Sequence, residues 1–163
     1  MTKPTLYAFE ITLHALPAEP APGPAFTDAL GTWPTLAIAK PALAVSMAAG
    51  FDDALADLAE LERMYAEPDG SFVWTSSRSS DAGAAWWQVD GNACEKDGRV
   101  LLVDLKGSCP PAEFDRLLAA FGWPAQPMMM LLVRSAVFLG EEAFRRHAMA
   151  RGLLGDGETL RPS

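Results

Sequence analysis

The segment that decides the fold is residues 86–107, WWQVDGNACEKDGRVLLVDLKG. Apolar and polar residues alternate on both sides of the turn at residues 95–98, which is the pattern of two strands in a hairpin. A three-residue connection at this turn predicts that Asp90 lies directly opposite Asp104. In that register one face of the hairpin is apolar, and Lys106 shares the other face with the two aspartates.

The segments around the hairpin predict a single α+β domain over residues 1–152. Its expected elements are strand 5–13, helix 50–66, strands 71–75, 86–92 and 100–106, helix 111–121, strand 128–133 and helix 141–151. We expect a mixed, mostly antiparallel sheet with the helices packed mainly on one face, and a parallel crossover from strand 100–106 to strand 128–133. A Pro-rich surface loop is predicted at 16–25 and a disordered tail at 153–163.

The composition limits the classes of function. The chain has 163 residues, of which half are apolar and 21% are charged, and its formal net charge is -8. Such an acidic balance disfavours a nucleic-acid coat protein or an electrostatic membrane anchor, and it suits a basic partner. We see no signal peptide and no membrane segment, and therefore expect a cytoplasmic protein. Two cysteines and two histidines without ligand spacing exclude a structural zinc site.

One cluster of residues predicts metal chemistry. Like charges directly opposite each other destabilise a sheet, so Asp90 across from Asp104 indicates a divalent cation, Mg²⁺ or Mn²⁺, between them. Lys106 can orient a metal-bound water or stabilise negative charge on a phosphate. Glu62, on the edge of the apolar stripe of helix 50–66, can reach the same site. The alternative is the solvated face of a half-buried hairpin, in which Lys106 neutralises both aspartates.

The same residues carry a resemblance to a known family. Val89-Asp90-Gly91, followed after the turn by Val103-Asp104-Leu105-Lys106-Gly107, resembles the motif of the PD-(D/E)xK nuclease superfamily. The order helix, three strands, helix, strand over residues 51–134 is similar to the core of that family. The resemblance implies a restriction-endonuclease-like core with Asp90 and Asp104 as metal ligands, Lys106 as the catalytic lysine and Glu62 as the acid on the helix.

Three functions fit these features. The most concrete is a divergent Mg²⁺- or Mn²⁺-dependent phosphodiesterase acting on nucleic acid, with Asp90, Asp104 and Lys106 as catalytic residues. The second is a non-catalytic acidic binding protein, of the antidote or adaptor type, that caps a basic partner protein. The third is a structural subunit that pairs through an apolar edge in a homodimer.

Overall fold

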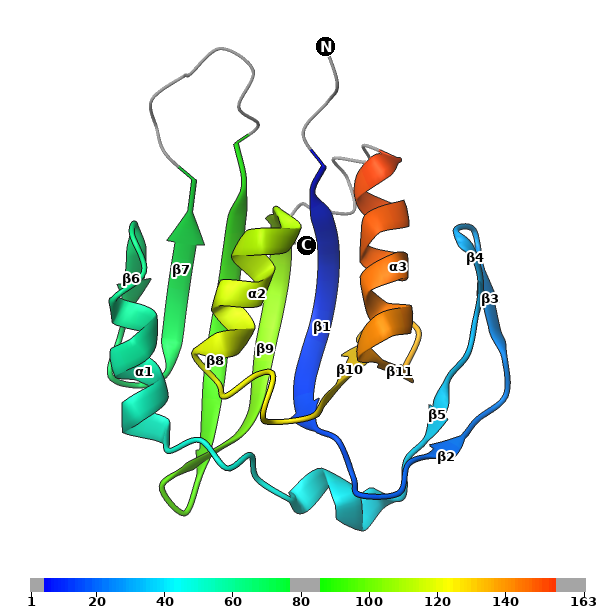
Figure 1. Cartoon of the computed structure of the whole chain (residues 1–163), viewed down its shortest axis with the longest axis horizontal. Coiled ribbons are helices and arrows are strands. Elements are labelled where there is room, and N and C mark those ends of the chain that lie inside the picture. The colour runs from blue at the N-terminus through cyan, green and yellow to red at the C-terminus, as the bar shows by residue number, and fades with distance from the viewer. Residues whose placement is uncertain (1–4, 77–85, 155–163) are drawn as a thin grey trace.

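The computed structural model describes residues 5–76 and 86–154, and these residues form one nine-stranded open sheet with three α-helices (Figure 1). The order across the sheet is β2-β5-β11-β10-β1-β9-β8-β7-β6, and the neighbouring strands are antiparallel. The sheet strands are β1 (Tyr7–Ala15), β2 (Ala21–Pro22), β5 (Leu36–Ala37), β6 (Met64–Ala66), β7 (Ser71–Thr75), β8 (Gln88–Lys96), β9 (Arg99–Cys109), β10 (Met128–Leu132) and β11 (Val137–Gly140). The helices are α1 (Phe51–Ala59), α2 (Pro111–Ala119) and α3 (Glu141–Leu153); a 3-10 helix spans Lys40–Ala44, and β3 (Phe26–Asp28) and β4 (Gly31–Trp33) form a separate hairpin.

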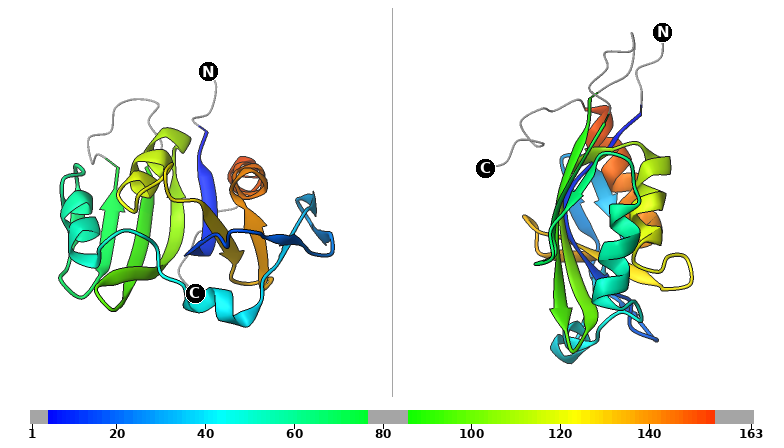
Figure 2. Two further views of the ribbon diagram at one scale, coloured as in Figure 1. Left: turned by 60° about the horizontal axis from the view of Figure 1, so that its bottom comes forward. Right: turned by 90° about the vertical axis from the view of Figure 1, so that its left-hand side faces the viewer.

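All three helices lie on the same face of the sheet, as the right-hand view of Figure 2 shows. Side chains alternate between the two faces of a strand, so every second residue of β1 points toward these helices. Phe9 of β1 contacts Phe114 of α2, with ring centroids 5.3 Å apart, and Phe144 of α3, at 6.3 Å. The predicted α+β fold with helices on one face is confirmed.

Helices α2 and α3 are tied to each other by a partly buried arginine. Arg145 of α3 pairs with Asp115 of α2 at 2.7 Å and with Glu141 of its own helix at 3.0 Å. Its guanidinium also lies 5.3 Å from the centre of the Trp123 ring, a cation–π contact. The helices therefore pack on the sheet through apolar side chains, and Arg145 links α2 to α3 through polar contacts.

Helix α1 is shorter than the helix predicted over residues 50–66. It ends at Ala59, and Arg63 takes a left-handed conformation with φ 61°, after which the chain enters β6 and pairs with β7. Two hydrogen bonds to β7 fix this turn. The indole Nε1 of Trp74 donates to the Glu62 carbonyl at 2.9 Å, and Arg63 Nε donates to the Thr75 carbonyl at 3.0 Å. The prediction that Glu62 lies on this helix is wrong, since Glu62 follows the end of α1.

The predicted parallel crossover from β9 through α2 to β10 is present, but its two strands are not neighbours. β9 and β10 run in the same direction, but β1 lies between them and is antiparallel to both. β1 buries one apolar face, which includes Phe9, Ile11 and Leu13, under the helices, whereas its other face carries the polar residues Glu10, Thr12 and His14. The two strands are therefore parallel without being neighbours.

The structure describes the predicted Pro-rich loop completely and the predicted C-terminal tail only at its start. The Pro-rich segment 16–25 lies at the surface and contributes the two-residue edge strand β2, which pairs with β5. The predicted tail begins inside α3, because Leu153 is the last residue of that helix, and residues 155–163 lie outside the described residues. Among the described residues, no helix is long and apolar enough to cross a membrane.

Candidate functional site

The face of the sheet opposite the helices, which we call the open face, carries polar residues in cross-strand rows. In one row Asp90 of β8 pairs with Lys106 of β9, which in turn pairs with Glu10 of β1. In the next row Asn92, Asp104 and Thr12 are neighbours in the same way. The three residues predicted to be catalytic therefore share one face, in two adjacent rows.

The register of the hairpin nevertheless differs from the predicted one. Asp90 lies opposite Lys106, and Asp104 lies opposite Asn92, so the two aspartates are diagonal neighbours and not a direct pair. The like-charge pair from which a bridging cation was inferred is absent from this arrangement. The prediction of that pair is wrong.

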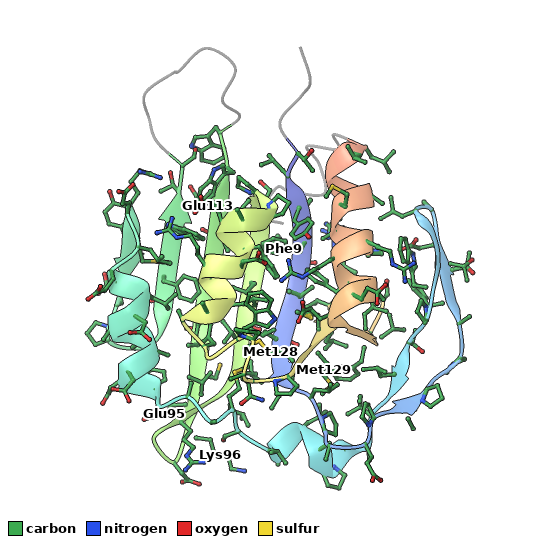
Figure 3. All side chains as sticks on the ribbon, in the orientation of Figure 1. Phe9, Glu95, Lys96, Glu113, Met128 and Met129 are labelled. Atoms are coloured by element: carbon green, nitrogen blue, oxygen red, sulfur yellow. The ribbon has the colours of Figure 1, made fainter. Side chains whose placement is uncertain are left out.

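Two local features shift the register. The turn contains only two residues, Asp97 and Gly98, both with positive φ (52° and 81°), so Lys96 pairs with Arg99. This is the conformation of a type I′ turn, whose twist matches that of the flanking strands. A bulge after Cys94 shifts the pairing by one more residue. Because the two shifts add up to two residues, the faces are unchanged; Figure 3 shows Glu95 and Lys96 at the tip of this hairpin.

The row through Asp90 balances its own charges. Lys106 Nζ lies 3.1 Å from Glu10 Oε2, and Arg134 Nε donates to Glu10 Oε1 at 3.0 Å. Burial alone raises the pKa of Glu10, but the hydrogen bonds and positive charges of Lys106 and Arg134 outweigh it, so the pKa lies below its ordinary value. From Asp90 to Arg134 the charges alternate in sign across the strands, which is the favourable arrangement for cross-strand pairs.

In the second row the negative charge of Asp104 has no cationic cross-strand neighbour. Asp104 faces Asn92 on one side and Thr12 on the other, both uncharged, and desolvation raises the pKa of Asp104 above its ordinary value. Thr12 Oγ1 is hydrogen-bonded to Nε2 of His14, at 2.7 Å. Burial lowers the pKa of His14, which favours its neutral form. Asp104 is therefore the carboxylate of the open face with the least nearby positive charge.

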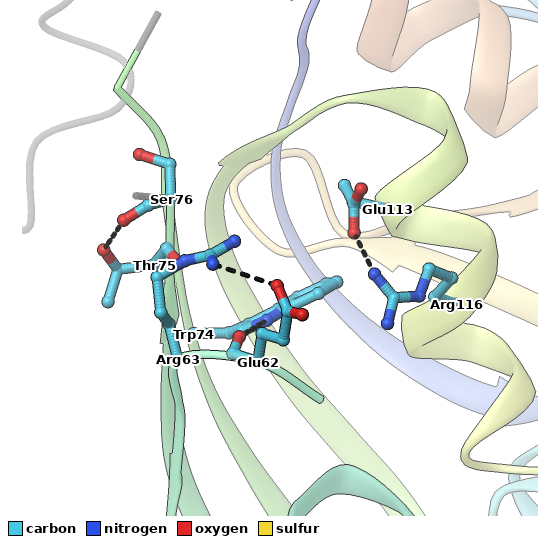
Figure 4. A network of polar contacts seen from close by, with 7 residues as sticks. All are labelled: Glu62, Arg63, Trp74, Thr75, Ser76, Glu113 and Arg116. Carbon is cyan, nitrogen blue, oxygen red and sulfur yellow. Dashed lines mark hydrogen bonds and ion pairs between the residues drawn. The ribbon is translucent and has the colours of Figure 1, made fainter. Parts of the chain in front are cut away.

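Glu62 lies apart from these residues. Its carbonyl accepts a hydrogen bond from Trp74, whose ring packs against Trp87 on the face that the helices cover. Figure 4 shows Glu62 beside Trp74, on the side of the sheet where α2 lies. Its carboxylate pairs with Arg63 at 3.2 Å. Among the residues that the structure describes, no group of three or more His, Cys, Asp or Glu side chains is arranged to hold a metal ion.

Sequence reasoning overlooked a concentration of acidic residues at one end of the molecule. Residues 52–69 contain seven acidic residues and one basic residue, Arg63, which give a net charge of −6. All seven carboxylate side chains are exposed. We call this surface the acidic end; it consists of Asp52, Asp53, Asp57, Glu60, Glu62, Glu67 and Asp69. The signal was present in the sequence as a run of acidic residues over the predicted helix 50–66 and the turn that follows it.

A hollow of about 350 Å³ adjoins the acidic end, where α1 approaches α2. Asp57 and Glu60 border it on the α1 side, and Arg116 and Ala120 border it on the α2 side. Arg116 is paired with Glu113 at 3.0 Å. The acidic end therefore has a concave part lined by two carboxylates whose negative charge is little reduced.

A partly buried hydrogen-bonded pair lies at the other end of the molecule. His147 Nε2 of α3 donates to Asp28 Oδ2 at 2.8 Å, and the indole Nε1 of Trp33 donates to Asp28 Oδ1 at 3.0 Å. The Trp33 ring also packs edge-on against His147, with centroids 5.1 Å apart. These contacts attach the β3–β4 hairpin to α3. No local pattern could have revealed a pair whose members are 119 residues apart in the chain.

The chain thus presents three surfaces to solvent and partners: the open face, the acidic end and the region around the Asp28–His147 pair. The open face offers mixed hydrogen-bonding groups, whereas the acidic end offers uncompensated negative charge. No family model, curated protein or solved structure matches this chain.

Proposed function

We propose that this protein is a non-catalytic binding protein whose acidic end caps a basic surface of a partner protein. The observation that carries the proposal is the charge distribution: residues 52–69 hold a net charge of −6 out of a total of −8. A surface of one sign raises the local concentration of oppositely charged partners and accelerates their association. The partner that fits it is a protein with clustered arginine and lysine side chains.

The acidic residues at the C-terminal end of α1 are placed where they weaken the helix. Asp57 lies in the last turn and Glu60 is the C-cap, so both carboxylates lie at the negative end of the helix dipole. Asp53 and Asp57 are four residues apart and repel each other. Both α1 and α3 carry acidic residues in the first turn, but the last turn of α3 holds Arg151, which is the stabilising arrangement that α1 lacks. Residues that break a local rule without a structural gain are expected at functional surfaces.

The hollow beside α2 gives this surface a shape that a partner can use. Asp57 and Glu60 flank an opening large enough to admit one long side chain. An arginine or lysine of the partner inserted there would place its cation near two carboxylates and near the C-terminal end of α1. The expected binding is fast and strongly dependent on salt, because rim charges act mainly on association.

The test compares two double variants that change the net charge equally. Asp57→Lys/Glu60→Lys reverses the centre of the acidic end, whereas Glu19→Lys/Glu95→Lys changes exposed acids elsewhere. Proteins captured from an extract at low salt are identified, purified and titrated calorimetrically against wild type and both variants. We expect a positively charged partner whose affinity falls at least tenfold with the first variant only. A partner that binds both variants equally, or one without positive charge, contradicts the proposal.

A second function, a metal-dependent phosphodiesterase, is favoured by one observation: Asp90, Asp104 and Lys106 lie on the same face of the sheet, the open face. This is the activity that the resemblance to PD-(D/E)xK nucleases implies. Diagonal cross-strand neighbours are roughly 7–8 Å apart, a separation that a hydrated Mg²⁺ or Mn²⁺ can bridge through its waters. The cation would be held by Asp90 and Asp104, and Lys106 would lie next to the phosphate.

Calorimetric titration with Mn²⁺ tests this second function, with assays on plasmid DNA and single-stranded RNA alongside. We expect one Mn²⁺ per chain, lost in Asp104→Ala and retained in Asp69→Ala, which removes an exposed aspartate outside the open face. Absence of binding at millimolar Mn²⁺ together with absence of cleavage contradicts a metal-dependent activity. Binding that Asp104→Ala leaves unchanged excludes Asp104 as a ligand.

A further inference from the structure

A second hollow, of about 250 Å³, lies at the opposite end of the molecule from the acidic end. It is bounded by the C-terminal half of α3, the turn between β10 and β11, and the tip of the β3–β4 hairpin, which lies beside α3 in Figure 1. Its apolar wall includes Leu30, Leu132, Val133 and Leu154, and its charged wall includes Arg134 and Arg151. We call it the α3 hollow.

Both oxygens of each carboxylate at the α3 hollow are already paired with a donor. Asp28 accepts hydrogen bonds from the Leu30 amide and the Trp33 indole at one oxygen and from His147 at the other. Glu10 is engaged by Arg134 and by a lysine of the open face, one at each oxygen. Burial raises the pKa of Asp28, but these hydrogen bonds and the charge of His147 outweigh it and lower the pKa overall. Neither acid is left to attract a cation.

The guanidinium of Arg134 is not used up in the same way. Arg134 donates to Glu10 through Nε, and its side chain is 57% exposed. Within the described part of the chain no partner is recorded for its two terminal nitrogens, and a guanidinium has five N–H donors. The remaining hydrogen-bonding capacity of the hollow is therefore that of a donor with positive charge.

The apolar wall is also incompletely covered. Val133 is 45% exposed and Leu154 is 65% exposed, which makes both of them outliers among the large apolar side chains of this protein. Exposed apolar side chains beside a concave site with a few convergent polar groups are typical of a ligand pocket. The volume is at or below the lower limit for small-molecule pockets, so the ligand has to be small.

We propose that the α3 hollow binds a small organic anion, with its apolar body against Leu132, Val133 and Leu154 and its anionic head on the guanidinium of Arg134. Carboxylates and phosphate monoesters share this chemistry, because a guanidinium binds either group through two parallel hydrogen bonds. This site is independent of the acidic end. Failure of one proposal therefore leaves the other in place.

The test is an NMR titration of the ¹⁵N-labelled full chain with hexanoate and hexyl phosphate, and with hexylammonium and inorganic phosphate as controls. For a ligand of this size we expect a dissociation constant in the millimolar range. Saturable shifts of the Leu30, Val133 and Leu154 amides with the two amphiphilic anions support the proposal, and the tighter of the two identifies the head group. No saturable shift with either anion, or equal shifts with hexylammonium, overturns it.

Two variants decide whether the shifts come from this hollow. Arg134→Gln should weaken binding at least tenfold, while Arg116→Gln, which removes an exposed arginine in a single ion pair, should leave it unchanged. Val133→Glu introduces a negative charge at an exposed position and provides a second test if Arg134→Gln perturbs the fold. Binding that survives both Arg134→Gln and Val133→Glu overturns the proposal.

Discussion

Replacing Asp57 by asparagine should stabilise the protein, although it removes a charged surface residue. Asparagine has nearly the same size and helix propensity as aspartate, so the substitution changes little besides the charge. Asp57 is exposed, lies in the last turn of α1, and is three and four residues from two other acids, Glu60 and Asp53. Each of these relations is unfavourable for a carboxylate.

The expected gain follows from these three relations. Each like-charge neighbour on a helix costs about 0.2–0.5 kcal/mol. A carboxylate at the C-terminal end of a helix costs roughly 0.3–1 kcal/mol at low ionic strength. We therefore expect Asp57→Asn to raise the free energy of unfolding by about 1 kcal/mol, which for a domain of this size raises Tm by roughly 2–4 °C.

Urea denaturation followed by circular dichroism measures the change, at low salt and again at about 1 M NaCl, where surface electrostatics are screened. Asp53→Asn is the matched control: it relieves one repulsion but loses a favourable position in the first turn, so its net effect should be close to zero. A stability of Asp57→Asn equal to or below that of wild type would refute the reasoning. So would a gain that is undiminished at high salt, because it could not be electrostatic.

Two substitutions and one chemical assay have defined outcomes. Gly107→Ala should lower the free energy of unfolding by roughly 2–4 kcal/mol, because Gly107 has φ 138° and an added Cβ would meet the carbonyl oxygen of Gln88. Urea denaturation measures this loss, and a value below about 1 kcal/mol would contradict the reasoning. Since the pKa of Asp28 is lowered by folding, its contribution to stability is present above its ordinary pKa of 3.8 and is lost as the pH falls below it. Asp28→Asn should therefore flatten the decline in the free energy of unfolding between about pH 5 and pH 2, and an unchanged slope would argue against the role given to this pair. Burial raises the pKa of both Cys94 and Cys109. Both thiols should therefore react with a disulfide reagent at pH 8 more slowly than free cysteine, and the reaction rate should rise on unfolding. A fast reaction of the native protein would contradict this prediction.

Patterns confined to one element were sufficient to predict most of the fold. The alternation in the hairpin places Val89 and Val103 on the buried face and Asp90 and Asp104 on the other, as the structure has them. The spacing of apolar residues in α2 predicts its buried stripe, which includes Phe114. In both cases the periodicity of the backbone fixes the face, so no knowledge of distant contacts is needed.

The pairing within the hairpin could not be obtained in the same way. Its register depends on whether the turn uses two or three residues and on a bulge near Cys94, and the sequence of the turn is compatible with either turn type. The predicted pairing differed by one residue at the turn and by one more at the bulge. The faces were predicted correctly because two such shifts preserve the alternation, not because the pairing was known.

The other differences between the predicted and the observed fold are due to contacts between residues far apart in the sequence. The apolar spacing continues past Ala59, but the chain leaves the helix because Trp74 and Thr75 of a neighbouring strand bind the Glu62–Arg63 segment. The insertion of β1 between β9 and β10 likewise brings Glu10 next to Lys106, across 96 positions of sequence. The metal site was inferred without Glu10, and Glu10 is the residue that pairs with the lysine.

The charge distribution now separates the two candidate functions on physical grounds. On the open face, Asp90, Lys106 and Glu10 alternate in sign across three neighbouring strands, so this row supplies its own counter-charges and attracts a metal cation only weakly. At the acidic end seven carboxylates share a single arginine, and this excess is neutralised only by ions or by a partner. High salt should therefore stabilise α1 and weaken partner binding together, since both effects arise from the same charges. A metal-dependent activity at Asp104 does not use these carboxylates, so Asp57→Lys/Glu60→Lys should leave it unchanged, whereas the same double variant should weaken partner binding.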